Sequence, residues 1–384
     1  MPDRILTTHT GSLPRPDDVR QALRHRELDE PIDEPALARR LPSATAEIVR
    51  AQVECGLDVV NDGEVSKVSY ATYVRDRLDG FGGTAESRPM ADLAAFPNYA
   101  RRLQTDLQGA RMSLACIGPV RLRDPDAIGR DLTRFQDAVA ALPAPPAGTF
   151  MTAASPGVIC RFFQNQHYAT EEDYLWAVAE AMRPEYRAIV GAGLTLQIDA
   201  PDLASARNTV FAGRPTEDFR RAAATQIEAL NWALDGLPPE QLRMHVCWGN
   251  YEGPHHLDVE LHEIIDLLLR ARPSWLSIEG SNPRHEHEWE VFQSVQLPDG
   301  KGVIPGVIDS TTNFVEHPRL VAQRLLRYTN RLGRERVMAG VDCGFATFAG
   351  LSGVDPDIAW AKLASLVEGA AIASEVTASG RPRP

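Results

Sequence analysis

Cysteine is scarce in this chain of 384 residues, which contains five. Small proteins that depend on disulfides for stability carry a much denser set. A chain of this length buries most of its surface without cross-links, so a disulfide scaffold is excluded. The cysteines are therefore expected to be reduced thiols in a cytoplasmic protein.

Long apolar runs and clusters of basic residues are also lacking. No stretch approaches the roughly 18 apolar residues of a membrane-spanning helix, and the residues after Met1 do not resemble a secretory leader. The 40 Lys and Arg against 52 Asp and Glu give a net charge of −12 and form no basic run. Nucleic acids and anionic membranes attract clustered positive charge, so neither is an expected partner. We expect small-molecule partners, and the composition leaves the oligomeric state open.

The sequence does contain a regular alternation of two kinds of segment. Short, apolar, β-branched runs that end in polar or glycine-rich clusters are separated by longer segments with helical spacing of apolar residues. The expected strands are Ile5–His9, Leu57–Asp62, Thr149–Thr152, Leu194–Asp199, Leu242–Val246, Trp275–Glu279, Val303–Ile308 and Val337–Val341. The expected helices include Ala44–Cys55, Glu171–Val190, Glu217–Leu234, Asp258–Arg270, Pro318–Leu332 and Pro356–Ala373. Eight such strands predict an α/β fold of the (β/α)8 TIM-barrel type.

Two regions depart from this alternation. Residues 1–50 are expected to add an N-terminal helical arm that includes the first strand. Glycines near residue 80 and prolines near residue 145 bound the interval 80–147, which predicts an insertion in a barrel loop, with a second small domain as the alternative. Because α/β barrels of about 250 residues with insertions form one unit, residues 1–384 are interpreted as one domain.

Candidate metal ligands lie at the ends of three expected strands. His245 and Cys247 flank one residue, and side chains alternate along a strand, so both point to the same face. Active sites of barrels lie at the carboxyl ends of the strands, where Glu279 ends the sixth strand and Cys343 follows the eighth. One His, two Cys and one Glu would make a tetrahedral zinc set. The alternative is a buried thiol beside a hydrogen-bonded histidine.

A rival ligand cluster is found at His285–Glu288. It opens an apparent helix that continues toward Trp289 and Phe292, so we interpret it as a solvated helix start. The remaining cysteines lack a comparable partner histidine and are expected in the core: Cys55, Cys116 and Cys160.

A series of motifs resembles, in order, the catalytic barrel of cobalamin-independent methionine synthase over nearly the whole chain. The motifs are Thr7–Pro14, Asp62–Glu64, Leu196–Asp199, His245–Cys247, Ser277–Glu279, Asp309–Thr311 and Asp342–Gly344. The resemblance implies a catalytic zinc on His245, Cys247, Glu279 and Cys343, and homocysteine contacts at Ser12, Glu64 and Asp199. The chain is about half the size of the full-length synthase and resembles the branch that has only the catalytic barrel. Epoxyalkane:coenzyme M transferase is a similar branch that activates another thiol against an epoxide.

The charge of such a site favours thiol chemistry. Zinc contributes +2, two thiolates −2 and Glu279 −1, which sums to −1 before substrate binds. A free thiol has a pKa near about 8.5, and coordination to zinc deprotonates it. An electron-rich centre is a poor Lewis acid for water but leaves a bound sulfur nucleophilic, so we expect alkyl transfer to sulfur rather than hydrolysis.

Two carboxylates are candidates for binding the rest of the thiol substrate. Glu64 and Asp199 would hold the ammonium group of an amino-acid thiol, which coenzyme M lacks; loop capping is their alternative role. Ser12 and the amide of Gly11 would take a carboxylate, or else form a simple turn.

Other polar residues at the expected rim have less defined roles. His9 and Asp309 are candidates for proton transfer, and Asn250 for a donor contact. Arg161 would bind an anionic donor or acceptor, or else lie on the surface.

The sequence thus predicts a zinc-dependent thiol S-methyltransferase with a homocysteine-type acceptor and an alkyl donor that the residues do not identify. The alternative is an epoxide-opening thiol transferase. A non-catalytic zinc protein and a metal-free relative of the tetrapyrrole decarboxylases fit the four ligands and rim carboxylates less well.

Overall fold

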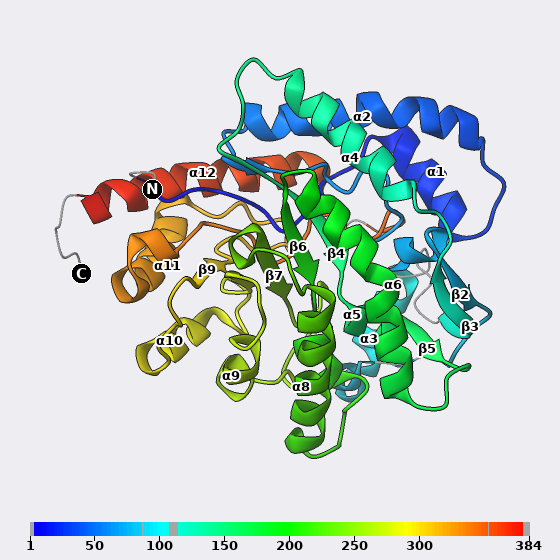
Figure 1. Cartoon of the computed structure of the whole chain (residues 1–384). Helices are drawn as coiled ribbons and strands as arrows, with labels where there is room; N and C mark the ends of the chain where they lie inside the picture. The colour runs from blue at the N-terminus through cyan, green and yellow to red at the C-terminus, as the bar shows by residue number, and fades with distance from the viewer. Residues whose placement is uncertain (1–3, 87, 89, 107–113, 352, 379–384) are drawn as a thin grey trace.

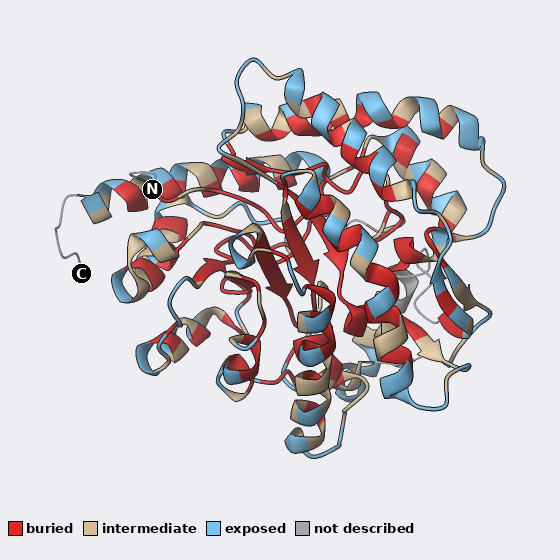
Figure 2. Cartoon of the chain, in the orientation of Figure 1, coloured by how far each residue is buried: buried red, intermediate tan, exposed pale blue. Residues whose placement is uncertain are grey.

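A ring of parallel segments lies at the centre of the computed structural model, which describes residues 4–86, 88, 90–106, 114–351 and 353–378 (Figure 1). Six strands form a parallel sheet in the order β1–β4–β6–β7–β8–β9. Their bounds are β1 Val59–Val60, β4 Gly148–Ala154, β6 Thr195–Asp199, β7 Leu242–Val246, β8 Trp275–Ile278 and β9 Gly302–Pro305. Their buried, mostly apolar residues form the core seen in red at the centre of Figure 2.

Two further segments close the ring between β9 and β1. Gly306 forms a parallel bridge with Gly340, and Thr7 forms one with Ala339. The amide of Val59 in β1 donates to the Thr7 carbonyl over 3.0 Å. The segments around residues 5–9 and 337–341 thus complete the set of eight, and the predicted barrel is confirmed.

Helices cover the outside of the ring, with their buried faces toward it (Figure 2). Local chemistry explains where helix α5 begins: Ser155 accepts a hydrogen bond from the amide of Val158, and Pro156 stands at the first helical position. The α-helices that follow the sheet strands are α5 Pro156–Phe162, α6 Glu171–Gly191, α7 Asp202–Ser205, α8 Thr216–Ala233, α9 Ile265–Leu268, α10 Val291–Ser294, α11 Pro318–Leu332 and α12 Pro356–Ala378. Short 3-10 turns are η1 Thr72–Asp76, η2 Ala91–Ala95, η3 Ala206–Asn208, η4 Pro239–Gln241, η5 Leu261–Glu263, η6 Glu286–Glu290 and η7 Arg334–Arg336.

The helix predicted over residues 258–270 is the clearest error in the predicted elements. The structure has only the 3-10 turn η5 and the one-turn helix α9 there. Asp258, the expected first residue, uses its carboxylate to bind His255 and His285. Ile264, with φ −127°, separates η5 from α9.

The N-terminal helices and the interval 80–147 pack outside the barrel. Helices α1 (Asp17–Glu27) and α2 (Glu34–Glu54) lie next to α4 (Ala127–Ala140) at the top of Figure 1. The interval also contains α3 (Pro97–Asp106), and its strands β2 (Leu78–Gly82) and β3 (Leu114–Leu122) join β5 (Phe163–Asn165) in a second sheet. Buried residues of these parts belong to the same hydrophobic cluster as the barrel, which supports the proposal of one domain.

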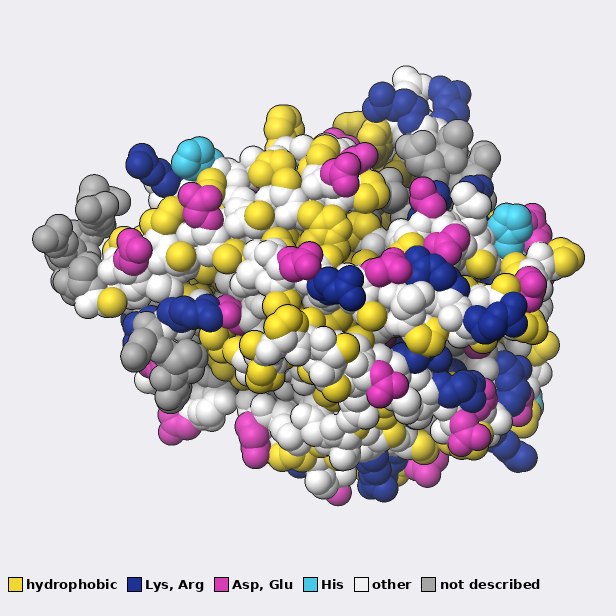
Figure 3. Space-filling view, turned by 90° about the horizontal axis from the view of Figure 1, so that it is seen from above, with side chains coloured by type: hydrophobic (Ala, Val, Ile, Leu, Met, Phe, Trp, Pro, Cys, Tyr) yellow, Lys and Arg dark blue, Asp and Glu magenta, His cyan; other side chains and the backbone are white. Residues whose placement is uncertain are grey.

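The surface mixes both signs of charge: acidic and basic side chains lie side by side on the face in Figure 3. Among the described residues, no helix has the length and apolar character needed to cross a bilayer.

A buried ion network fastens the loop that follows β1. Arg77 donates to Glu185 over 2.8 Å and also contacts Asp131, and all three side chains are buried. Tyr73 donates to Glu185 over 2.5 Å and accepts from the amide of Ala154 in β4. The network therefore ties the β1 loop to α4, α6 and β4.

Replacing Arg77 with Met should lower the free energy of unfolding by about 3–5 kcal/mol, because two buried carboxylates lose their shared cation. Urea denaturation measures this change. The matched control is Arg123→Met, whose guanidinium is half exposed and 3.8 Å from Asp79, with an expected change within about 0.5 kcal/mol. Equal effects of the two substitutions would contradict the assignment.

Candidate metal centre and its cavity

A cavity of about 400 Å³ opens at the carboxyl ends of the barrel strands. Residues from the loops after β1, β4, β6, β7 and β9 line it, as do residues after the segment 337–341. Seven residues of the predicted site line this cavity: Ser12, Glu64, Asp199, His245, Cys247, Asn250 and Cys343.

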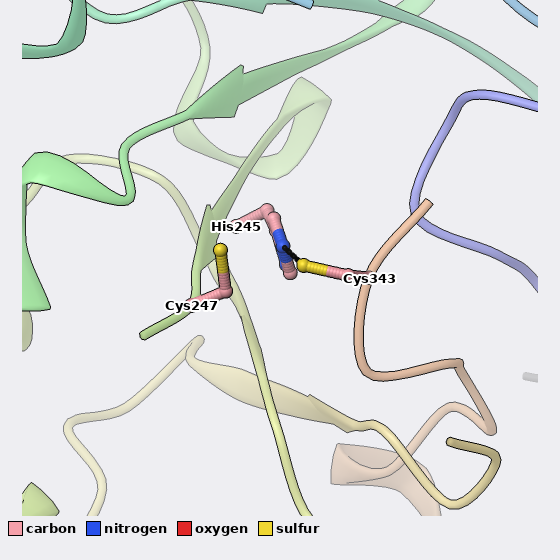
Figure 4. Close-up of side chains that lie close together, drawn as sticks. All are labelled: His245, Cys247 and Cys343. Carbon is pink, nitrogen blue, oxygen red and sulfur yellow. Dashed lines mark hydrogen bonds between the residues drawn. The ribbon is translucent and has the colours of Figure 1, made fainter. Parts of the chain in front are cut away.

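Three candidate metal ligands converge in this cavity. His245 stands on β7, Cys247 follows β7, and Cys343 follows the segment that closes the barrel (Figure 4). Their three donor atoms lie within 4.8 Å of one another, and His245 Nε2 is 3.4 Å from Cys343 Sγ. The geometry therefore offers one imidazole nitrogen and two sulfurs to a single ion.

The protonation of these groups suits metal binding. Burial lowers the pKa of His245 to about 4, so its imidazole is neutral at physiological pH. The second ring nitrogen, Nδ1, lies 3.2 Å from the Ser277 hydroxyl, which orients the ring with Nε2 toward the sulfurs. A hydrogen bond from Cys343 lowers the pKa of Cys247, and the same contact with burial raises that of Cys343, so negative charge is favoured on Cys247.

Glu279, the predicted fourth ligand, is outside this group of three donors. Its Oε1 accepts from the backbone amide of Trp248 over 2.9 Å, and its Oε2 accepts from Asn282 over 3.3 Å. Burial raises the pKa of Glu279 well above its usual value, and a nearby dication would favour the carboxylate instead. Its role as a ligand stays a prediction.

Glu64 is held at the cavity by an unusual backbone turn. Gly63 and Glu64 have φ values of +66° and +55°, and a Cβ on Gly63 would lie 2.5 Å from Ile48 Cγ2. The side chain of Glu64 also passes close to Gly11, where a Cβ would be 2.6 Å from Glu64 Oε1. The two glycines therefore allow a strained, buried carboxylate to reach the cavity.

A chain of donors orients the Glu64 carboxylate. Lys67 Nζ donates to the Thr152 hydroxyl oxygen over 2.9 Å, and that hydroxyl donates to Glu64 Oε1 over 2.9 Å. Glu64 Oε2 is buried and has no hydrogen-bond partner among the described residues. Burial and the nearby Glu64 raise the pKa of Asp199 to about 7, and Gln197 donates to it over 2.7 Å. Among the described residues, Lys67 acts on both carboxylates, but neither forms a direct ion pair with a Lys or Arg side chain.

Ser12 and Asn250 line the cavity through contacts between loops. The Ser12 hydroxyl accepts from the amide of Ala346 over 3.4 Å. Asn250 donates to the carbonyl of Gly344 over 2.8 Å and accepts from the Ser310 hydroxyl over 2.9 Å. Asn250 thus connects the loop after β7 with the loops after β9 and Cys343.

The two residues predicted for proton transfer do not line the cavity. His9 lies inside the barrel, where its Nε2 is 2.8 Å from Gln52 Oε1 and burial lowers its pKa to about 3. Asp309 holds a turn, in which its carboxylate accepts from the amides of Thr311 and Thr312 over 3.0 and 2.9 Å. Asp309 therefore shapes the loop that presents Thr311 to the cavity.

Sequence reasoning missed residues that only the tertiary structure brings together. Asp342 accepts hydrogen bonds from the amides of Gly280, Ser281 and Asn282 and so fixes the loop that carries Cys343.

The loop after β1, the helix α5 and the loop after Cys343 supply an aromatic cluster, while the interval 80–147 supplies part of one wall. These lining residues are Tyr70, Phe162 and Phe348, and Met90, Tyr99 and Leu103.

The interpretation of His285–Glu288 as a solvated helix start is wrong. His285 is 2% exposed, and its two ring nitrogens lie 3.1 Å from Asp258 and 2.9 Å from Glu288. His255 approaches the same Asp258 oxygen at 2.6 Å and its other nitrogen faces the carbonyl of Tyr251. All four nitrogens thus face acceptors, which favours two imidazolium groups at the loop after β7.

The fold and the cavity together define a barrel protein with a candidate metal centre at the carboxyl ends of its strands. Residues 159–367, more than half of the chain, match the family model described as "Cobalamin-independent synthase, Catalytic domain". The chain belongs to this family, and the resemblance seen in the sequence is confirmed.

Relatives match along nearly their whole length. A methionine synthase from Saccharolobus solfataricus is 24% identical over 96% of this chain and 95% of its own. A 2-hydroxypropyl-CoM lyase from Xanthobacter autotrophicus is 26% identical over 96% and 94%. The structure of a B12-independent methionine synthase from Shewanella sp. W3-18-1, in complex with selenomethionine, superposes with a TM-score of 0.73, at 20% identity over 98% and 99% of the chains. This structural similarity supports the assignment of the barrel fold.

Stability should depend on pH through His285. Burial opposes the charged form of His285, but the hydrogen bonds that its ring nitrogens donate to Asp258 and Glu288 raise its pKa from 6.5 to about 10. A group with a raised pKa stabilises the folded state fully below its unfolded value, and this contribution is lost as the pH rises toward the folded value. The free energy of unfolding should therefore fall between pH 7 and pH 10 by more than about 1.4 kcal/mol, the equivalent of one pKa unit.

Denaturation curves across this range test the assignment, with His285→Gln as the variant that lacks the titrating group. The exposed His262→Gln is the matched control and should keep the slope of the wild type. If the free energy of unfolding depends on pH equally in His285→Gln and the wild type, the assignment to His285 is contradicted.

Proposed function

We propose that this protein is a zinc-dependent enzyme that transfers an alkyl group, in the simplest case methyl, to the thiol of an amino-acid substrate of the homocysteine type. The observation that carries the proposal is the cavity itself. It combines a His–Cys–Cys donor set with the unpartnered oxygen of Glu64 and with Asp199. One molecule with a thiol and an ammonium group would bind to both parts: its sulfur to the metal ion and its ammonium group to the two carboxylates.

The donor set fits zinc. A neutral histidine nitrogen and two cysteine sulfurs, all buried, are ligands that zinc prefers, and three protein ligands leave a position for substrate. His245, Cys247 and Cys343 would hold the ion, with Glu279 as the proposed ligand of the fourth position when no substrate sulfur occupies it. Zinc bound there would supply Lewis-acid activation of a thiol, which keeps the sulfur ionised and nucleophilic.

The remaining residues bind and orient the acceptor. Glu64 Oε2 and the Asp199 carboxylate would accept hydrogen bonds from the substrate ammonium, which would give this buried pair a direct ion-pair partner. Lys67 and Thr152 keep Glu64 Oε1 occupied, so that Oε2 faces the substrate. Ser12 would bind the substrate carboxylate. Aromatic side chains on the cavity wall would help to exclude water from the reacting sulfur.

A second candidate function is epoxide opening by an anionic thiol such as coenzyme M. The 26% identity with a 2-hydroxypropyl-CoM lyase favours it. Glu64 and Asp199 oppose it, because buried carboxylates without a direct ion-pair partner would repel a sulfonate.

Replacing Cys247 or Cys343 with Ser should remove stoichiometric zinc and alkyl transfer together, because a hydroxyl is a poor zinc ligand. Elemental analysis measures the zinc content, and homocysteine consumption with a methyl donor measures transfer. The matched control is Cys160→Ser, a thiol on α5 outside the cavity, which should retain both. An active Cys247→Ser protein without metal would overturn the zinc mechanism.

Glu64→Gln and Asp199→Asn should retain zinc but bind homocysteine about 10- to 100-fold more weakly, because each loses a charged hydrogen bond. Calorimetry with the zinc-loaded protein measures both homocysteine and coenzyme M. Coenzyme M has no ammonium group, so its affinity should not fall.

Asp202→Asn serves as the control for a buried carboxyl that binds Ser155 and does not line the cavity. Unchanged homocysteine affinity in Glu64→Gln and Asp199→Asn would refute their role. Tighter binding of coenzyme M than of homocysteine by the wild type would instead favour epoxide opening.

A further inference from the structure

Arg243 is a buried cation inside the barrel, below the candidate metal centre. It stands on β7 two residues before His245, so both side chains point to the same face of the strand. Arg243 is 3% exposed and does not line the cavity. All three of its nitrogens donate hydrogen bonds: Nε to Gln197 Oε1 over 2.6 Å, Nη1 to the Thr8 hydroxyl over 3.0 Å and Nη2 to the His9 carbonyl over 2.7 Å.

The first of these hydrogen bonds begins a relay that ends at Asp199. Gln197 on β6 is the register partner of Arg243, and Asp199 lies two residues further along β6, at the cavity. The Nε2 group of Gln197 donates to Asp199 Oδ1 over 2.7 Å and also contacts the Thr10 carbonyl. A side-chain amide has one accepting end and one donating end. The hydrogen bond from Arg243 to Oε1 therefore fixes Gln197 with its donating end toward Asp199.

The other cavity carboxylate is held by a relay of the same kind. Thr152 on β4 is the register partner of Gln197, and it connects Lys67 to Glu64 Oε1. In both relays a buried cation acts on a carboxylate through one neutral side chain. Each relay occupies one carboxylate oxygen, and the described residues form no hydrogen bond to the other oxygen, Oε2 of Glu64 or Oδ2 of Asp199.

The charges of Arg243 and Asp199 support each other across this relay. No carboxylate of the described chain forms a direct ion pair with Arg243. The charge of Asp199 favours the charged form of Arg243, against the effect of burial, which lowers the pKa of the guanidinium. A direct ion pair would occupy Asp199 with a protein cation, whereas a relay through Gln197 orients the carboxylate and leaves an oxygen for a ligand.

We propose that Arg243 is a positioning residue that determines substrate specificity: through Gln197 it fixes the Asp199 carboxylate so that Oδ2 receives the ammonium group of the thiol substrate. The inference rests on the proposed function, because it assigns the residue that prepares the ammonium side of that site. Arg243 is outside the cavity and acts only through Gln197. It therefore contributes to the binding of thiols that carry an ammonium group and not to the binding of thiols that lack one.

The test compares homocysteine with 4-mercaptobutyrate, which has the same thiol and carboxylate but no ammonium group. Calorimetric titrations use the zinc-loaded wild type, Arg243→Lys, Gln197→Leu, the variant with both substitutions, and Thr8→Val. Lysine has a methylene group where arginine has its Nε–H, so Arg243→Lys removes the donor to Gln197 and keeps a buried cation. Thr8→Val is the matched control, because it removes another acceptor of Arg243 and leaves the hydrogen bond to Gln197 in place.

Arg243→Lys should lower the affinity for homocysteine about 3- to 10-fold, whereas its affinity for 4-mercaptobutyrate and its zinc content stay those of the wild type. Thr8→Val should keep both affinities. In the Gln197→Leu background, Arg243→Lys should cause no further loss, because two residues that act through one relay have non-additive effects. Arg243→Met is the second variant if Arg243→Lys does not fold, and the same pattern is expected of it.

Unchanged homocysteine affinity in Arg243→Lys, an equal loss for both thiols, or a further loss in the Gln197→Leu background would each overturn the proposal. The wild-type titration reports separately on the proposed function, which fails if homocysteine does not bind. Crystal structures of the zinc-loaded wild type and Arg243→Lys then decide on the positioning. Loss of the hydrogen bond between Gln197 and Asp199 in Arg243→Lys would support it, and the same hydrogen bond in both structures would refute it.

Discussion

Closure of the barrel is the constraint on which the site depends. The segments 5–9 and 337–341 pair in parallel with each other and with β1 and β9, so the carboxyl ends of all eight segments meet at one rim. Cys343 follows the closing segment, and only this closure brings it to His245 and Cys247. The fit is tight at this point, because a Cβ on Gly306 would lie 2.2 Å from Asp342 Oδ1.

Buried charge is distributed unevenly around this rim. The network of Arg77, Asp131 and Glu185 contains its own cation, as does the pair of imidazoles around Asp258. Glu64 and Asp199 differ, because neither has a direct ion pair among the described residues, and Lys67, which acts on both, donates to Thr152. The charged groups of the two networks are thus paired within the protein, whereas the two carboxylates at the cavity remain able to bind a positively charged group of a substrate.

Much of the fold could be predicted because strands and helices have different periods and because polar residues mark strand ends. The spacing of His245 and Cys247 also predicts a common face, and Cys343 at a strand end predicts convergence in a closed barrel. The aromatic cluster could not be found in this way, since Tyr70 and Phe348 come from two loops and Phe162 from the end of α5, with no shared motif. His285 misled because the residues toward Trp289 and Phe292 resemble a solvated helix, while its partner Asp258 lies 27 residues earlier in the chain.

The interval 80–147 reaches the cavity without supplying any candidate metal ligand. Met90, Tyr99 and Leu103 contribute to the wall, and Asp92 binds the hydroxyl of Tyr251 and the amide of His255 in the loop after β7. The donor set at the centre and part of the wall around it thus come from different stretches of the chain. A barrel built in this way allows the wall of its cavity to diverge through an outlying segment, while the donor set at the centre stays the same.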